Sequence, residues 1–437
     1  MRRNTELGLL VLVCAITGGA YVLASFGTDA ELPVDIGPFL LIVLALLLFA
    51  NLVMRRVAPE ADPILLPMAG LLNGLGYVMI ARIDESLAVK QAGWTAVGIA
   101  AFAGTLWFVR RSRDLATYRW TFALVGMALL LLPLVPGIGQ EVFGSQIWVK
   151  IGPVNFQPGE FAKIALAIFF AAYLVEKREL LAMGSWGVGP LRIPDPKHLG
   201  PVLLAWGASL VVMVLQKDLG SSLLFWTLFL VMLWVSTQRA SYLVVGLGLF
   251  AAGATVAWNA FGHVRQRVDI WLDPWTDPKG DGFQIVEAAF AMADGGLTGT
   301  GLGLSGRVII PAAETDFIIA VIAEELGLLG ASVVLAAFLL IVGSGLRIAE
   351  RADNAFDKLL CTGLSALIGV QAFIIIAGVT RVLPLTGVTL PFVSYGGSSL
   401  LANYVLIALL LRISDETNRR ALAGGAAAAG ATTGAPR

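Results

Sequence analysis

An acidic residue stands where a long polar stretch of this sequence gives way to an apolar one. Asp316 follows the glycine-dense residues 295–303 and directly precedes the apolar segment that begins at Phe317. A carboxylate at the edge of an apolar phase can have its pKa raised by desolvation, which suits it to accept a proton. The alternative is that Thr315 or Asp316 only caps the helix that begins at Phe317.

Other charged residues accompany Asp316. Glu324 and Glu325 lie within the apolar segment, and Arg265 and Arg267 stand near the start of the polar stretch, which runs from residue 261 to 316. These acids are more than a helix cap requires. A connection of this length in a compact protein is usually functional if it has no secondary structure of its own. We therefore expect this loop to carry the chemistry and the neighbouring helices to hold it over a lipid-facing cavity.

Two further polar clusters interrupt apolar runs. Glu160 and Lys163 are three positions apart, so they share one face of a helix. They either line a cavity or form a helix-start acid with a lysine that reaches towards water. Gln216, Lys217 and Asp218 break an apolar run near a glycine. Such a break leaves helix ends that can bind charged ligands, although an ordinary tight turn also explains it.

The last cluster combines a cation with hydroxyl groups and small residues. Arg381 precedes a Pro-Leu-Thr-Gly turn, and Ser394, Tyr395, Ser398 and Ser399 follow within the next 20 residues. Small residues let helices or a lipid chain approach closely, and packing alone is the alternative explanation.

The composition of the chain indicates that these residues lie in or beside a membrane. The chain has 437 residues, of which 57% are hydrophobic and 14% charged. Soluble domains carry about 25% charged residues. We expect an all-α polytopic membrane protein in which apolar runs of roughly 20 residues each cross the bilayer. The twelve predicted helices lie near 7–26, 36–54, 64–82, 91–109, 118–136, 160–175, 199–216, 219–236, 241–260, 317–346, 359–379 and 393–412.

Loop charges orient this bundle. With twelve spans, the clusters of Lys and Arg between helices fall on one side, which predicts that both termini are cytoplasmic. Residues 261–316 then form a large extracytoplasmic loop. Residues 1–60 are expected to be an accessory helix pair, residues 61–420 the transmembrane core with ten helices, and the Ala/Gly/Thr-rich residues 421–437 a disordered cytoplasmic tail.

Several functions are disfavoured. Basic and acidic residues both number 30, so no net charge attracts nucleic acid. The cysteines, Cys14 and Cys361, fall in apolar runs and the histidines in separate loops, which argues against a His/Cys metal site. Residues 301–306 match G-x-G-x-x-G, but no strand precedes them. A mobile loop, or a nest of N–H groups for a phosphate, fits this segment better than a dinucleotide site.

These clusters, in this order, resemble the SEDS family of bacterial cell-wall proteins, the RodA/FtsW/SpoVE group. The resemblance covers roughly residues 64–414. The matching segments are Phe156-Gln-Pro-Gly-Glu160 with Lys163, Gln216-Lys-Asp-Leu-Gly220, Asp273-Pro-Trp-Thr-Asp-Pro278, residues 295–303, Thr315-Asp-Phe317, Ala323-Glu-Glu-Leu-Gly327 and Leu390-Pro-Phe-Val-Ser-Tyr-Gly-Gly-Ser-Ser399. Departures include Gln146-Ile147 where Arg-Arg is common and Lys217 where Pro is common. The N-terminal helix pair and Arg381 look most like a RodA-type elongation protein.

The resemblance implies a peptidoglycan glycosyltransferase of the bacterial cytoplasmic membrane that polymerises lipid II, with Asp316 as the essential acid. Joining a sugar hydroxyl to an anomeric carbon that bears a lipid pyrophosphate needs a base, and cations for the leaving group. A divalent cation, Mg²⁺ or Mn²⁺, held by carboxylate and pyrophosphate is compatible with this chemistry. The candidate pyrophosphate ligands are Lys150, Lys163, Lys217, Arg265, Arg267 and Arg381.

The expected partners are lipid II and lipid-linked glycan, a class B penicillin-binding protein, and other membrane proteins of the elongation machinery. Three alternatives stay open at this point: a lipid-precursor flippase, an FtsW-type division protein, and a non-catalytic scaffold for the penicillin-binding protein. An enzyme should fail when Asp316 is changed, whereas a flippase should depend on charges inside the bundle.

Overall fold

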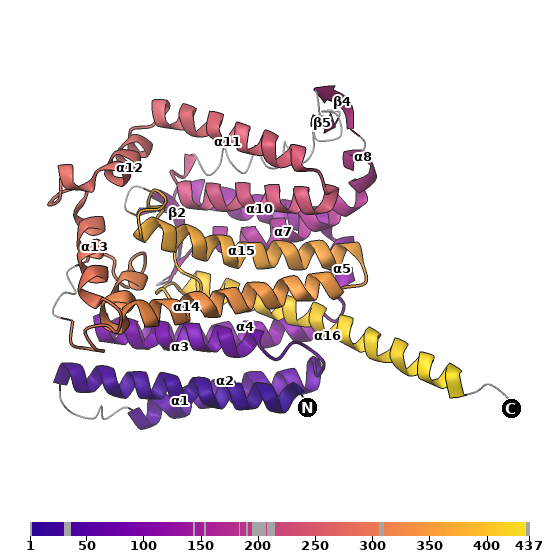
Figure 1. Ribbon diagram of the computed structural model, residues 1–437, viewed down its shortest axis with the longest axis horizontal. Coiled ribbons are helices and arrows are strands. Elements are labelled where there is room, and N and C mark those ends of the chain that lie inside the picture. The colour runs from indigo at the N-terminus through magenta and orange to yellow at the C-terminus, as the bar shows by residue number, and fades with distance from the viewer. Residues whose placement is uncertain are drawn as a thin grey trace.

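The computed structural model describes residues 2–29, 36–142, 145–152, 154–182, 184–188, 191–194, 207, 215–305 and 310–433. Figure 1 shows long helices lying side by side, with both termini towards one end of the bundle and the 261–316 connection at the other. In chain order the helices are α1 (Arg2–Asp29), α2 (Ile36–Val57), α3 (Leu65–Ile83), α4 (Glu85–Phe108), α5 (Ser112–Thr117), α6 (Arg119–Leu131), α7 (Gly159–Glu176), α8 (Arg178–Ala182), α10 (Leu219–Thr237), α11 (Ala240–Ala260), α12 (Gly262–Leu272), α13 (Phe283–Gly295), α14 (Ile318–Arg351), α15 (Ala355–Val379) and α16 (Gly397–Thr433).

Seven of the described helices are long and apolar enough to cross a membrane, namely α1, α3, α10, α11, α14, α15 and α16. The predicted spans near 36–54, 91–109, 118–136 and 160–175 are helical as well, as α2, α4, α6 and α7. The predicted span near 199–216 lies almost wholly outside the described residues. Along α11, large apolar side chains such as Leu247 (61% exposed) face outward, as expected for a helix in contact with lipid.

The centre of the bundle is formed by α15, which packs against α14, α7 and α10, while α16 packs along α4. Close helix contacts depend on small residues. A Cβ on Gly76 of α3 would overlap the backbone of Val393, and a Cβ on Gly98 of α4 would press on the ring of Tyr404. Tyr404 is fully buried, and its hydroxyl oxygen accepts a hydrogen bond of 3.1 Å from the side-chain amide of Asn73. These contacts join α16 to α3 and α4.

The N-terminal helix pair is attached to the bundle at both of its ends. α1 packs against α2 and α3. Near its start, the Arg3 guanidinium donates hydrogen bonds to the Glu6 carboxylate and to the Ala61 carbonyl, which forms a buried ion pair. The helix α1 begins at Arg2, five residues before the predicted start at residue 7. At the other end of α1, Gly27 lies so close to Leu302 that a Cβ would overlap its carbonyl oxygen.

The described part of the protein also contains five short strands, which the all-α prediction did not include. β1 (Gly139–Val142), β2 (Ser145–Ile151) and β3 (Val154–Phe156) form an antiparallel sheet between α6 and α7, and β4 (Gly184–Val188) pairs with β5 (Leu191–Pro194). In β2 the aliphatic residues Ile147, Val149 and Ile151 occupy every second position, which is the period of a strand rather than a helix.

Two segments expected to lack regular structure are helical. The 261–316 connection contains α12, a 3₁₀ turn (Pro274–Thr276) and α13, so it is a folded cap and not a structureless loop. Residues 421–433, expected to be disordered, continue α16 and extend away from the bundle (Figure 1). Alanine has the highest helix propensity of any residue, so an Ala-rich tail that follows a stable helix can extend it.

Candidate active site

α14 is interrupted where the glycine-dense segment joins it. Gly327 has φ +67° and ψ −169°, which breaks the helical hydrogen-bond ladder. The segment replaces the missing bonds: Leu328 and Leu329 donate to the carbonyls of Gly296 and Leu297 at 3.0 and 3.2 Å. In return, the N–H groups of Thr300 and Gly301 donate to the carbonyls of Glu324 and Glu325 at 2.9 and 3.1 Å.

These bonds correct the earlier interpretation of the segment. The N–H groups of Thr300 and Gly301 already have acceptors in α14, and that of Gly303 donates to the Glu325 carboxylate at 3.1 Å. They are therefore not free to form a nest for a phosphate, and residue 306 of the G-x-G-x-x-G match lies outside the described residues. Backbone polar groups at membrane depth must be satisfied by the protein, which explains why the segment inserts there.

The side chain of Glu325 also holds the glycine-dense segment in place. Its carboxylate forms an ion pair of 2.5 Å with Arg82 of α3 and accepts a bond of 2.8 Å from the Ser305 hydroxyl. Arg82 also donates to the Ser305 carbonyl at 2.7 Å. Glu324, the residue directly before it, is buried as well. Both acids thus lie inside the bundle, and Glu325 holds the glycine-dense segment against α3.

Asp316 lies immediately before α14 without capping it. The N-cap residue is Phe317, and it makes no side-chain capping bond. Asp316 is held instead by its backbone, which donates to the Ala312 carbonyl at 3.1 Å in a tight turn where Ala312 has φ +59°. The carboxylate is therefore available for another role, which disfavours the capping alternative.

The Asp316 carboxylate and the Arg267 guanidinium of α12 both lie beside Gly387. From the Cβ position of residue 387, Asp316 Oδ2 lies at 3.6 Å and Arg267 Nη2 at 3.9 Å. Arg267 is fixed by a bond of 3.0 Å from its Nη1 to the Thr386 carbonyl. Gly387 has φ +72°, a conformation that other residues rarely adopt, and its missing side chain leaves room beside both charged groups.

The charges at this place influence one another. Burial raises the pKa of Asp316 to about 6, while the positive charge of Arg267 and a hydrogen bond from Thr315 lower it and the charges of Glu314 and Asp218 add to the rise. Burial also raises the pKa of Asp218, which accepts a capping bond of 3.0 Å from Ser221 and is likewise stabilised by Arg267. Arg267 therefore stabilises the charged forms of both Asp316 and Asp218, which lie near the starts of two different helices.

A buried ion pair lies behind the 386–389 turn. Lys163 Nζ donates to Glu160 Oε2 at 2.6 Å and to Gln371 Oε1 at 2.7 Å. Gln371 Nε2 in turn donates to the Thr389 carbonyl at 2.8 Å. Both charged side chains are almost fully buried, so Lys163 is not a lysine that reaches towards water. The network connects α7 and α15 to the turn that contains Gly387.

The polar break before α10 joins the bundle to the three-stranded sheet. The side-chain amide of Gln216 donates to the Leu130 carbonyl, and the backbone carbonyl of Gln216 accepts a bond of 3.0 Å from the Gln146 N–H. Lys217 has φ +58° and pairs with Glu141 at 3.6 Å on the surface. Of this cluster, only Asp218 belongs to the group of charges around Asp316.

Two of the candidate cations hold other parts of the protein. Arg381 donates to the carbonyls of Trp271 and Leu272 at 3.2 and 3.1 Å, and the Trp271 indole donates back to the Arg381 carbonyl at 3.0 Å. This reciprocal contact fastens α12 to the turn after α15. Arg265 lies on α12 with its guanidinium 5.5 Å from the ring centre of Trp258.

The serine-rich motif before α16 supports the turn that carries Asp316. The Ser394 hydroxyl donates to the Thr315 carbonyl and accepts from the Leu390 N–H, and the Tyr395 N–H donates to the Glu314 carbonyl at 2.8 Å. The Ser398 hydroxyl accepts from the Gln157 N–H at 3.0 Å, and the Ser399 hydroxyl bonds Asn403 at 3.2 Å. Of these four residues, Ser394 and Tyr395 support the Asp316 turn through its backbone carbonyls, whereas Ser398 and Ser399 bond Gln157 and Asn403.

Sequence reasoning missed several members of these networks. Arg82, Ser305 and Gln371 lie far along the chain from the residues they bind, and each stands alone in an apolar or loop segment. A glutamine within the apolar run of α15 was the one local signal, since a buried amide needs a partner.

The helix bundle, its apolar spans and a partly buried acid at one end define an integral membrane protein with a polar site at the membrane boundary. The chain belongs to the FtsW/RodA/SpoVE family of cell cycle proteins, whose family model matches residues 68–419.

Curated relatives extend this match over nearly the whole chain. The peptidoglycan glycosyltransferase RodA of Mycobacterium bovis is 46% identical over 429 residues, which cover 96% of this chain and 92% of the relative. That of Mycobacterium leprae is 44% identical over 95% of this chain and 91% of the relative. A probable peptidoglycan glycosyltransferase FtsW of a Geobacter species is 33% identical over 83% of this chain and 99% of the relative.

Solved structures agree in fold. A chain from a peptidoglycan synthase complex that coordinates polymerization and crosslinking has a TM-score of 0.69 and 27% identity, and covers 82% of this chain and 98% of its own length. The rod shape determining protein RodA of Thermus thermophilus has a TM-score of 0.58 and 25% identity, covering 81% and 96% of the two chains.

Proposed function

We propose that this protein is a peptidoglycan glycosyltransferase that polymerises lipid II during cell-wall elongation, with Asp316 as general base. The observation that carries the proposal is the partly buried Asp316 carboxylate, which lies with Arg267 beside Gly387 and caps no helix. The 46% identity to mycobacterial proteins named peptidoglycan glycosyltransferase RodA, against 33% to an FtsW, supports the elongation role.

The proposed step is a displacement at the anomeric carbon of one lipid-linked sugar. The hydroxyl oxygen of the acceptor sugar attacks that carbon while its proton passes to the Asp316 carboxylate. The bond from the anomeric carbon to the pyrophosphate oxygen breaks, and the lipid pyrophosphate leaves as an anion. Arg267 is the cation nearest to Asp316, so it is our candidate for stabilising the departing charge.

The remaining candidates are assigned by their distance from this pair. Asp218 shares Arg267 with Asp316 and is proposed to bind substrate or to position the arginine. Glu160 and Lys163 are proposed to hold the turn that carries Gly387. Arg265 lines a cavity of about 510 Å³ on α12, which we propose as an approach for the pyrophosphate or sugar.

A divalent cation and a protein partner belong to the same proposal. Among the described residues, no group of three His, Cys, Asp or Glu side chains is arranged to hold a metal ion. A Mg²⁺ or Mn²⁺ ion would therefore need pyrophosphate oxygens as well as the carboxylates of Asp316 and Asp218. We propose a class B penicillin-binding protein as partner, because a similar chain has been solved within a peptidoglycan synthase complex.

We further propose twelve spans in the bacterial cytoplasmic membrane, with both termini in the cytoplasm and α12 and α13 outside. The supports are the side on which Lys and Arg accumulate and the position of both termini at one end of the bundle (Figure 1).

The deciding experiment is glycan polymerisation from purified lipid II by the purified full-length protein, with its partner and with either Asp or Asn at position 316. Polymerisation that depends on Asp316 supports the enzyme. Lipid II transport without polymerisation would favour a flippase, and neither activity would favour a scaffold.

A further inference from the structure

A second polar cavity lies at the opposite end of the bundle from Asp316. It has a volume of about 240 Å³, and its lining residues come from two helices, α14 and α16, and from the turn before α3: Asp62, Pro63, Ile64, Arg347, Ile348, Arg351, Ser414, Thr417 and Asn418. No step of the proposed glycosyl transfer uses these residues. Pockets for drug-sized ligands measure roughly 300–1,000 Å³, so this one suits a smaller group.

Two arginines border the cavity from α14. Arg347 and Arg351 are four positions apart, so they share one helix face. Arg347 donates to the Ser344 hydroxyl at 2.9 Å, whereas Arg351 makes no hydrogen bond or ion pair within the part of the chain that the structure describes. The one acidic lining residue is Asp62, whose carboxylate accepts from the Ile64 N–H at 2.8 Å in its own turn. The lining therefore carries a net positive charge.

One lining residue on α16, Thr417, carries a hydroxyl that has no hydrogen-bond partner among the described residues. Thr417 is only 5% exposed. Buried polar groups normally have partners, so this hydroxyl is free to bind a ligand. Arginines near the end of α14 also complement the helix dipole, which would explain their charge but not the hydroxyl of Thr417.

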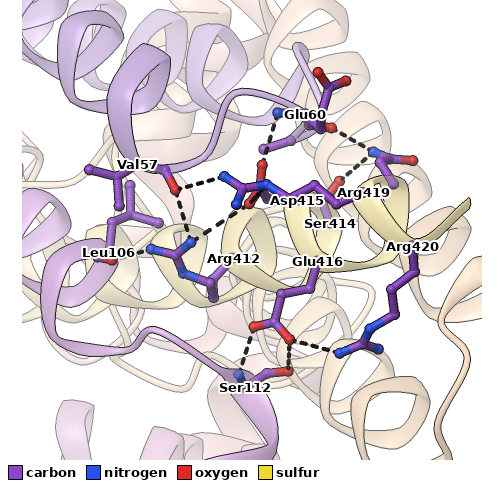
Figure 2. Close-up of polar contacts among 12 residues, drawn as sticks. Val57, Glu60, Leu106, Ser112, Arg412, Ser414, Asp415, Glu416, Arg419 and Arg420 are labelled. Carbon is purple, nitrogen blue, oxygen red and sulfur yellow. Dashed lines mark hydrogen bonds and ion pairs between the residues drawn. The ribbon is translucent and has the colours of Figure 1, made fainter. Parts of the chain in front are cut away.

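The wall that carries Thr417 is held firmly in place. Figure 2 shows Arg412 bonded to the carbonyls of Val57 and Leu106, and Glu416 bonded to Ser112 and Arg420. On the cavity side, the Ser414 hydroxyl accepts from the Asp62 N–H at 3.0 Å. The cavity therefore has a rigid wall on α16, joined directly to the turn before α3.

The N-terminal end of α3 completes the site. Its N-cap residue, Ile64, makes no side-chain capping bond and lies in the lining. The N-terminus of a helix carries a partial positive charge that favours anions. A helix terminus, two arginines and a buried hydroxyl are the groups with which proteins bind phosphate.

We infer that this cavity binds a phosphate ester, and that its source is the headgroup of an anionic glycerophospholipid. The apolar surface beside the arginines favours the lipid over a soluble phosphate. Leu339, Leu340 and Leu346 of α14 are 64%, 46% and 46% exposed, so acyl chains can lie on the same helix that presents its arginines to the headgroup. In the proposed orientation this lipid comes from the cytoplasmic leaflet, where anionic lipids attract basic residues.

Native mass spectrometry of the full-length protein in detergent, titrated with dioleoyl phosphatidylglycerol or with dioleoyl phosphatidylcholine, tests the inference. We expect phosphatidylglycerol to bind more tightly. The Arg347→Gln/Arg351→Gln variant should weaken it about fivefold for each arginine. Thr417→Val keeps the shape of the side chain and should weaken it roughly threefold to tenfold, as expected for one hydrogen bond.

The matched control is Arg110→Gln/Arg113→Gln, which removes two exposed arginines at the same end of the bundle but outside the cavity. An equal loss in this control, or equal binding of phosphatidylcholine, would overturn the inference. A competition arm with glycerol 3-phosphate separates the two sources. If glycerol 3-phosphate binds with the same dependence on the arginines and phosphatidylglycerol does not, the lipid source is wrong.

Discussion

Arg267 and Asp316 both lie next to Gly387, with Nη2 of the arginine 3.9 Å and Oδ2 of the aspartate 3.6 Å from the Cβ position of residue 387. The arginine lies on α12 and the aspartate in the turn before α14. In the sequence, α13 and the glycine-dense segment stand between them. An acid and a cation at this spacing can share one reacting group between them. The predictions below begin with this pair.

Asp316→Asn should abolish most polymerisation while leaving the protein folded. Asparagine keeps the size and hydrogen bonds of the side chain but cannot accept the proton, so we expect a loss of roughly 10²–10⁴-fold. The measurement is glycan synthesis from lipid II, with membrane abundance and partner binding as controls. Activity within a few-fold of the unaltered protein would show that Asp316 is not the base.

The pH profile should report the pKa of Asp316. Its folded-state pKa of about 6 lies above the ordinary value of 3.8, so the proton is bound more tightly in the folded protein. The basic form predominates above pH 6, and activity should fall about tenfold per pH unit below it. By the same linkage, this residue favours folding most at low pH, and its contribution falls as pH rises from about 4 to 6.

Arg267→Gln should shift that profile in a defined direction. Arg267 lowers the pKa of Asp316, so removing its charge should raise the pKa and move the acidic limb to higher pH. The measurement is the pH dependence of polymerisation in the variant, and Arg265→Gln, on the same helix, is the control. An unshifted limb would mean that the two groups do not interact.

Lys163→Met should damage folding, because it leaves the Glu160 carboxylate buried without its cation. The expected loss of stability is about 3–5 kcal/mol, measured by thermal unfolding in detergent. Lys163→Arg should be milder, and adding Glu160→Gln to Lys163→Met should recover part of the loss. Lys90→Met, at an exposed site, is the control. Equal stability of Lys163→Met and Lys90→Met would contradict the buried pair.

Gly327→Ala should disrupt the junction between α14 and the glycine-dense segment. The new Cβ would overlap the backbone of Gly299 and Leu297, and φ +67° is strained for alanine. We expect a loss of at least roughly 1–3 kcal/mol in thermal unfolding, together with reduced polymerisation. Gly343→Ala in the same helix meets no atom within 4 Å and should be neutral or slightly stabilising. Similar melting of the two variants would argue against the junction.

The proposed topology predicts that residues 281 and 421 lie on opposite sides of the membrane. In a protein with Cys14 and Cys361 replaced by serine, single substitutions Asp281→Cys and Ala421→Cys should react with an impermeant thiol reagent from outside and from inside, respectively. Both positions are exposed, so access should not limit labelling. Labelling from the same side would rule out the three spans, α14, α15 and α16, that the proposed topology places between them.

The amino-acid sequence by itself determined where apolar helices lie and which acid stands at the membrane boundary. Both are local properties: a span needs one continuous apolar run, and Asp316 adjoins such a run directly. Family motifs in the sequence also indicated the protein family. Local pattern was misleading in the 261–316 connection. There α12 is polar, and both α12 and α13, with 11 and 13 residues, are too short to be predicted as membrane spans.

Only the tertiary structure decided which polar residues act together. Lys163 meets Gln371, which lies 208 positions later, and Arg267 meets the Thr386 carbonyl 119 positions later. The glycine-dense segment, which overlaps the G-x-G-x-x-G match, completes the hydrogen bonds of α14. Helix periodicity reports which side of a helix is apolar but not which helix will pack against it, so pairings between distant segments emerge only when the bundle closes.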